Sequence, residues 1–120
     1  MEEVIKIFEQ IKNTNSLNEK TAIVMKNKDN ELFKECLVFL LDSNITTGLS
    51  NKKLNKKVNI TKHINITCSF RDIMEYLKIN NSGRDSDISI VQGFINKQPE
   101  KYRDFYSQMV TKTYKLGADK

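Results

Sequence analysis

Apolar side chains recur at intervals of three and four residues in six separate segments of this 120-residue sequence. This spacing places them along one face of an α-helix, because the helix completes a turn every 3.6 residues or so. Runs of Asn, Ser, Thr, Asp and Gly separate the segments, and such runs are typical of helix caps and turns. The pattern predicts an all-α fold, an orthogonal bundle of about six helices. The length predicts one domain over 1–120.

The first three helices follow from their stripes and caps. One is expected over 2–13 and a second over 16–28, each ending in a polar run. Asp29 is the expected cap of the third. After Glu35, that third helix is apolar on nearly every side, which predicts a central, buried position.

The next two helices have recognisable starting signals. Ser69 and Asp72 form an Asp variant of the capping box before a fourth helix over 69–79. Turn residues follow, and either Asp85 or Ser86 is the expected cap of the fifth helix. Both signals are local, so they predict where each helix begins.

The sixth helix should begin at Pro99, which suits a first helical turn, and should close at Gly117 as a left-handed residue. The final residues, 118–120, have the pattern of another helix start. We therefore expect the sequence to be a domain truncated from a larger protein.

Residues 44–66 carry the surplus of positive charge. They contain five lysines, the only histidine and no acidic residue, in a chain of net charge +5. Residues 44–68 fit no helical pattern, so one long basic loop is expected between the third and fourth helices. Alternation of polar and apolar residues in 58–67 makes a short hairpin an equal alternative. Lysines among Asn, Ser and Thr donors indicate a phosphate-binding surface, whereas a solvated loop is the simpler interpretation.

Several classes of function lack their usual residues. His63 is the single histidine, so Ser-His-Asp or Cys-His catalysis has no candidate base apart from a surface residue. With Cys36 and Cys68 it gives no plausible zinc set, and no phosphate-binding glycine motif occurs. We expect no catalytic residue, no metal ligand and no cofactor. The longest apolar run is far shorter than a membrane span, and no secretory signal opens the chain, so a cytoplasmic protein without a membrane partner is expected.

Three segments combine positive charge with backbone donors, as phosphate binding requires. The first contains Thr47, Gly48, Ser50, Asn51, Lys52, Lys53, Lys56 and Lys57. The second is the turn formed by Asn81, Ser82, Gly83 and Arg84, and the third surrounds the expected end of the sixth helix at Lys112, Lys115, Gly117 and Lys120. Each has an ordinary structural alternative, namely a solvated loop, an interhelical turn and a set of lysines that complement the helix dipole. The three gain weight only if they share a face.

A series of short motifs recurs in a characteristic order: Lys26–Leu32, Thr47–Gly48, Ile73–Leu77, Ser82–Gly83, Gly93–Ile95 and Leu116–Ala118. In order and spacing this series resembles the N-terminal DNA-binding domain of the phage-type ATP-dependent DNA ligases, over most of the chain. The resemblance implies a monomeric all-α domain of a DNA replication and repair enzyme. Such a domain grips nicked duplex DNA through the sugar-phosphate backbone across the minor groove, largely without regard to sequence.

The same resemblance implies which partners and residues take part. In a full ligase, a nucleotidyltransferase domain and an OB-fold domain would encircle the nick together with this one, and ATP and Mg²⁺ would serve that parent enzyme. The Lys-x-Asp-Gly motif of the nucleotidyltransferase does not occur in this sequence, so the chain alone is not expected to be an enzyme. Carried over by position, 48–57, 82–84 and 112–117 form the DNA-facing set, with Lys112 where the family often has arginine. Residues 58–67 match nothing in the family.

Three alternatives remain open. One is a small helical protein-interaction module whose lysines serve solubility only. The second is a small phage regulator, and the third is a fragment of a different phage replication enzyme. A helix-turn-helix regulator needs a turn of about three or four residues between its helices, and 80–85 is longer.

Overall fold

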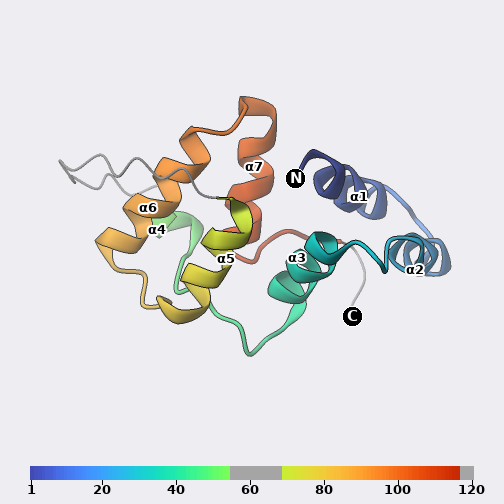
Figure 1. Ribbon diagram of the computed structural model, residues 1–120, viewed down its shortest axis with the longest axis horizontal. Coiled ribbons are helices and arrows are strands. Elements are labelled where there is room, and N and C mark those ends of the chain that lie inside the picture. Colours follow the sequence, from blue (N-terminus) through green and yellow to red (C-terminus); the bar gives the residue numbers. More distant parts are fainter. Residues whose placement is uncertain (55–68, 117–120) are drawn as a thin grey trace. The chain divides into compact units, whose positions relative to one another are not determined.

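The computed structural model describes residues 1–54 and 69–116, in which the chain forms seven α-helices and no strand (Figure 1). The prediction of an all-α fold is therefore confirmed. Internal contacts divide the chain into two compact units, unit 1 with Met1–Asp42 and Lys115–Lys120, and unit 2 with Ser43–Tyr114. The predicted hairpin over 58–67 lies outside the described residues.

Unit 1 is built from α1 (Glu2–Lys12), α2 (Leu17–Lys26) and α3 (Glu31–Leu41). Helix α1 packs on both α2 and α3. The rings of Phe8 and Phe33 lie 5.4 Å apart between centroids, and both side chains are fully buried. The stripes read from the sequence thus form the core of this unit.

Two predictions about α3 are wrong in detail. Its cap is Asn30, whose Oδ1 accepts a hydrogen bond from Phe33 N at 3.1 Å, whereas Asp29 belongs to the preceding turn. The helix is also not buried on every side, because Val38 and Leu41 are 53% and 43% exposed. An apolar run of this length passes around the whole helix, so part of it faces away from the core.

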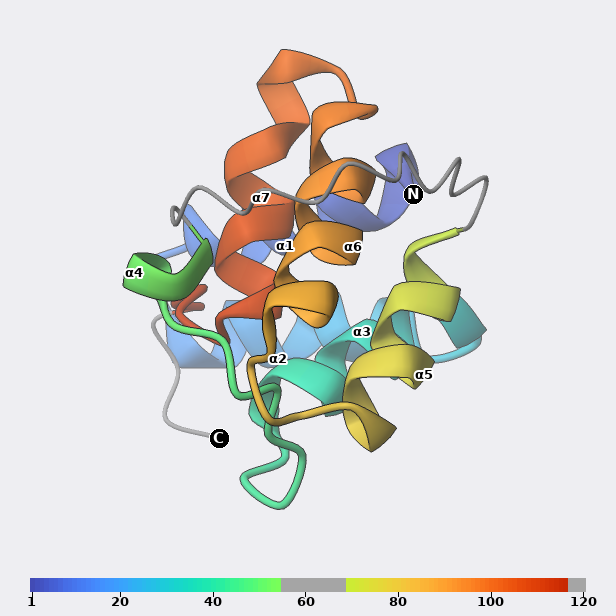
Figure 2. The same cartoon turned by 90° about the vertical axis from the view of Figure 1, so that its left-hand side faces the viewer.

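Unit 2 contains α4 (Asn51–Leu54), α5 (Phe70–Ile79), α6 (Asp85–Asn96) and α7 (Glu100–Val110). Helix α6 packs on α7, beside which it lies in Figure 2, and also on the short α4. Phe70, Phe94 and Tyr106 form an aromatic cluster with centroids 5.1–5.9 Å apart. Helix α4 corrects the expectation that the basic loop lacks helical structure.

Of the two helix starts predicted in unit 2, the start of α5 is confirmed and the cap of α6 is a different residue. Ser69 and Asp72 form the expected capping box, with Ser69 Oγ accepting from Asp72 N at 3.3 Å and Asp72 Oδ2 accepting from Ser69 N at 3.1 Å. The cap of α6 is Arg84, not Asp85 or Ser86, and its carbonyl accepts from Ile88 N at 2.9 Å. Asp85 lies one position inside the helix, where its charge complements the helix dipole.

The end of α7 differs from the prediction. The helix stops at Val110, and Lys112 adopts the left-handed conformation with φ of 57°. Lys112 N donates to Met109 O at 3.1 Å and Thr113 N donates to Gln108 O at 2.8 Å, which is the hydrogen-bond pattern of a Schellman motif. Lys112 therefore has the role predicted for Gly117, which lies outside the described residues.

None of the helices in 1–54 and 69–116 is both long enough and apolar enough to cross a lipid bilayer.

Candidate nucleic-acid interface

Thr47 fastens the segment that leads into α4 to the end of α7. Its side chain is buried, and Oγ1 donates to Val110 O at 2.7 Å while accepting from Leu49 N at 3.3 Å. Both capacities of this hydroxyl are therefore used inside the fold. Thr47 positions the segment, whereas the neighbouring Thr46 is exposed.

Gly48 and Gly83 bring the first and second predicted segments into contact. Both have positive φ, 69° and 67°. A Cβ on Gly48 would lie 2.6 Å from the carbonyl carbon of Asn81 and 2.8 Å from Gly83 N, distances that real side chains essentially never show. The two loops thus touch backbone to backbone, and only glycine fits.

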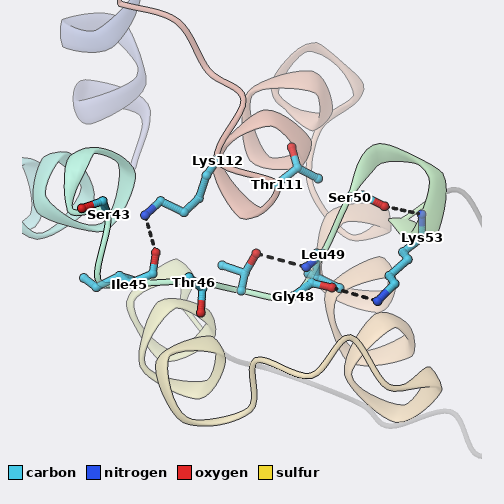
Figure 3. A pocket seen from close by; sticks show the side chains of 10 residues that line it. Ser43, Ile45, Thr46, Gly48, Leu49, Ser50, Lys53, Thr111 and Lys112 are labelled. Carbon is cyan, nitrogen blue, oxygen red and sulfur yellow. Dashed lines mark hydrogen bonds between the residues drawn. The ribbon is translucent and has the colours of Figure 1, made fainter. Parts of the chain in front are cut away.

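Lys53 lies where these two loops meet. Its Nζ donates to Gly48 O at 3.4 Å, and a Cβ placed on Gly83 would come within 2.7 Å of the same Nζ. The residue is in α4, whose first turn is closed by Ser50, since Ser50 Oγ accepts from Lys53 N at 3.2 Å (Figure 3). A short helix therefore sets this ammonium group beside both glycines.

Lys112 joins the end of α7 to the same segment. Its Nζ donates to the carbonyl of Ile45. Figure 3 shows the Lys112 side chain extending from the end of α7 to the segment 43–50. The left-handed conformation at Lys112 turns the chain sharply just after the helix, which directs the side chain toward Ile45. The first and third predicted segments are thereby held together.

These groups surround an open pocket of about 400 Å³ in unit 2. Its lining includes Ser43, Ile45, Thr46, Thr47, Gly48, Leu49, Ser50, Lys53, Thr111 and Lys112. Two ammonium groups, from Lys53 and Lys112, lie on its wall together with exposed hydroxyls of Thr46 and Ser50. Cationic and hydroxyl donors around an open depression are the groups that contact phosphate oxygens.

The positive charge of α4 has no counter-charge within the described residues. Lys52 and Lys53 are both exposed, and neither forms an ion pair with a carboxylate in 1–54 or 69–116. By contrast, Lys78 of α5 pairs with Glu75 at 3.0 Å. The two α4 lysines are therefore available to an external anion.

Arg84 has a structural role within unit 2. Its Nε lies 3.3 Å from Asp87 Oδ2 and an Nη donates to Asn80 Oδ1 at 3.2 Å. Asp87 is fully buried and accepts a hydrogen bond from the Tyr76 hydroxyl, so Arg84 supplies the charge that a buried carboxylate needs. Its side chain is 60% exposed, which leaves one face open to solvent.

The same network changes the pKa of Tyr76. Burial of the phenol, followed by its hydrogen bond to Asp87 and the negative charge of that carboxylate, raises the pKa of Tyr76 to about 12. The hydroxyl consequently stays protonated as a donor to Asp87. This network ties α5 to the first turn of α6, next to the loop that contacts Gly48.

The remaining predicted residues are distributed differently. Asn51 begins α4, and Ser82 is exposed in the turn before α6. Lys115 is exposed but belongs to unit 1, whereas Lys112 belongs to unit 2, so the third segment divides between the units. Lys56, Lys57 and Gly117, together with Lys62 and His63, lie outside the described residues.

Sequence reasoning missed Thr46 and Ser43, which line the pocket. Asn81 belonged to the predicted turn, but the close approach of its backbone to Gly48 was not predicted. A run of hydroxyl and amide residues from 43 to 47 was a usable signal for the first two. The contact at Asn81 had none, because it depends on chain segments far apart in sequence.

No group of three or more His, Cys, Asp or Glu side chains that could hold a metal ion occurs among the residues described. The chain matches no family model, no curated protein and no solved structure. The likeness to a ligase domain thus stays a prediction, and a functional argument depends on the geometry of unit 2.

Proposed function

We propose that this chain is a non-catalytic duplex DNA-binding domain that grips the phosphate backbone across the minor groove, largely without regard to sequence. The observation that carries the proposal is the convergence of Gly48, Lys53, Gly83 and Lys112 in unit 2. Each of the three candidate segments contributes a residue to this group, and the positive charge comes from Lys53 and Lys112.

The chemistry of this surface suits phosphate better than base edges. Lysine ammonium groups act as point charges and lack the planar fork with which arginine reads guanine. Lys52 and Lys53 can neutralise phosphates, while the hydroxyls of Thr46 and Ser50 can donate to phosphate oxygens. Contacts of this kind position a protein on DNA without specifying sequence.

We further propose that the domain serves an ATP-dependent DNA ligase. The resemblance in sequence supports this step, since it places the cationic segments where those enzymes contact nicked DNA. Nucleotidyltransferase and OB-fold domains of the parent chain would then supply adenylation and closure around the nick, with ATP and Mg²⁺ as their cofactors.

A salt titration of duplex binding tests the proposal. Fluorescence anisotropy of a labelled duplex should show log affinity falling with log salt at a slope of about −4 to −5 if about five phosphates are neutralised. Nicked and intact duplexes of several sequences should be compared. No binding at low salt would remove the DNA proposal, and strong preference for one sequence would remove the ligase assignment.

A second candidate, a protein-interaction module, is favoured by the exposure of apolar side chains. Met25 and Val38 of unit 1 are 57% and 53% exposed, and apolar side chains at the surface can contact a partner protein. The same anisotropy experiment separates the two candidates, because a module of this kind would not bind duplex DNA with the stated salt dependence.

A further inference from the structure

Unit 1 contains an apolar pocket of about 330 Å³ that is independent of the cationic surface in unit 2. Apolar side chains of α1, α2 and α3 line it together with Leu116. The lining includes one charged residue, Lys20 of α2. A mostly apolar pocket with a single charged group is the usual composition of a small-molecule site.

Lys20 is buried in an unusual environment for a lysine. Lys20 is only 7% exposed. Its Nζ donates one hydrogen bond, to Leu116 O at 2.7 Å. No carboxylate in 1–54 or 69–116 forms an ion pair with it. An ammonium group has three donors, and within 1–54 and 69–116 a single carbonyl accepts from one of them while no carboxylate balances the charge. Buried charge of this kind is costly unless an anion approaches.

The rim of the pocket is apolar and open to solvent. Leu17 and Leu41 both line the pocket, and they are 62% and 43% exposed. Large apolar side chains that surround a depression and remain in contact with water mark sites where an apolar ligand displaces that water. A ligand in this pocket would therefore place an apolar end against the two leucines and an anionic end against the ammonium group of Lys20.

We propose that this pocket binds a small apolar molecule that carries one carboxylate group. The carboxylate lies against Lys20 Nζ, and the aliphatic or aromatic body lies between Leu17 and Leu41. A neutral ligand would bring no counter-charge to the ammonium group, and a cation would be repelled by it. The volume is at the lower end of the range for small-ligand pockets, which favours a compact ligand.

Octanoate is a suitable probe, with octan-1-ol as its neutral counterpart of equal chain length. The ¹⁵N-labelled 120-residue chain is titrated with each, and amide shifts are followed by nuclear magnetic resonance. Octanoate is expected to shift Leu17, Thr21, Leu41 and Leu116, which line the pocket, and to bind more tightly than octan-1-ol. Shifts confined to unit 2, or equal affinity for the two probes, would overturn the proposal.

The Lys20→Met variant keeps an apolar stem and removes the charge. We expect octanoate affinity to fall about tenfold or more, because a charge-assisted hydrogen bond is lost, while octan-1-ol affinity stays within a factor of about two. Lys26→Met is the matched control, since Lys26 is exposed on the same helix and does not line the pocket. Unchanged octanoate affinity in Lys20→Met would overturn the proposal.

Leu17→Asp provides an independent test if Lys20→Met fails to fold. Leu17 is exposed, so the substitution should preserve the fold while placing a negative charge at the rim. Octanoate should bind more weakly to this variant by a larger factor than octan-1-ol does. Equal weakening of both probes would show that charge has no part in recognition and would contradict the proposal.

Discussion

Gly48 and Gly83 approach each other so closely that neither position accepts a side chain. Both have positive φ, and a Cβ on Gly48 would lie 2.8 Å from Gly83 N. This contact joins the loop before α4 to the loop before α6, and Lys53 donates to the Gly48 carbonyl at the same place. The cationic surface therefore depends on the backbone of two glycines as well as on lysine side chains.

Gly48→Ala should destabilise the protein by at least about 2 kcal/mol. The left-handed conformation alone costs a non-glycine residue about 1–2 kcal/mol, and the clash with Asn81 adds to it. Gly93→Ala is the matched control, because Gly93 lies inside α6 with no atom within 4 Å of an added Cβ. That change should stabilise the helix by about 0.5–1 kcal/mol. Urea denaturation measures both, and equal stability of the two variants would contradict the close approach.

The Lys52→Ala, Lys53→Ala double variant should weaken duplex binding by about 10- to 100-fold at moderate salt and make the salt slope less negative by about 2. Both side chains are exposed, so the melting temperature should change little. Lys78→Ala is the control, since that lysine of unit 2 is already paired with Glu75. If the double variant and the control bind DNA equally, α4 does not belong to the interface.

Lys112 can be tested with a pair of substitutions. Lys112→Gly and Lys112→Ala both remove the ammonium group and its hydrogen bond to Ile45, so both should weaken DNA binding to the same extent. They differ in backbone cost, because alanine retains the strain of φ at 57° and glycine does not. The glycine variant should be more stable by about 1 kcal/mol in chemical denaturation. Equal stability would contradict the left-handed conformation.

The sequence predicted the features of this fold that depend on neighbouring residues. The capping box of Ser69 and Asp72 was predictable because both partners lie within one helical turn. The helical stripes were predictable for the same reason. The end of α7 was not, because a lysine rarely adopts the left-handed conformation and Gly117 offered the more usual signal.

The candidate site was predictable in composition but not in geometry. Glycines and lysines in 47–53 and 82–84 indicated phosphate binding, yet their contact joins positions far apart in the chain. Thr47 is the opposite case, a predicted binding residue whose side chain the fold uses for its own structure. Its hydroxyl looked available in the sequence, whereas it is used by Val110 and Leu49 inside the fold. Arg84 likewise was a predicted phosphate-binding residue, whereas in the fold it forms an ion pair with the buried Asp87.

Stability should fall in alkaline solution through Tyr76. The pKa of Tyr76 is raised from 10.0 to about 12 in the folded protein, so the unfolded chain loses the phenolic proton first. The contribution of Tyr76 is therefore fully present below pH 10 and is lost as the pH rises toward 12. Tyr76→Phe should remove this part of the pH dependence and, at neutral pH, cost about 1–3 kcal/mol because Asp87 loses a buried donor.

Unfolding measured from neutral pH to pH 12 in the two proteins isolates the effect, since other tyrosines and the lysines titrate in both. The free-energy difference between wild type and Tyr76→Phe should shrink as the pH rises above 10. Tyr102→Phe is the control: Tyr102 is half-buried in α7 and is not part of the Asp87 network, so its loss should leave the alkaline slope unchanged. A constant difference between wild type and Tyr76→Phe would show that the phenol does not donate to Asp87, and the coupling of α5 to the start of α6 would then need another explanation.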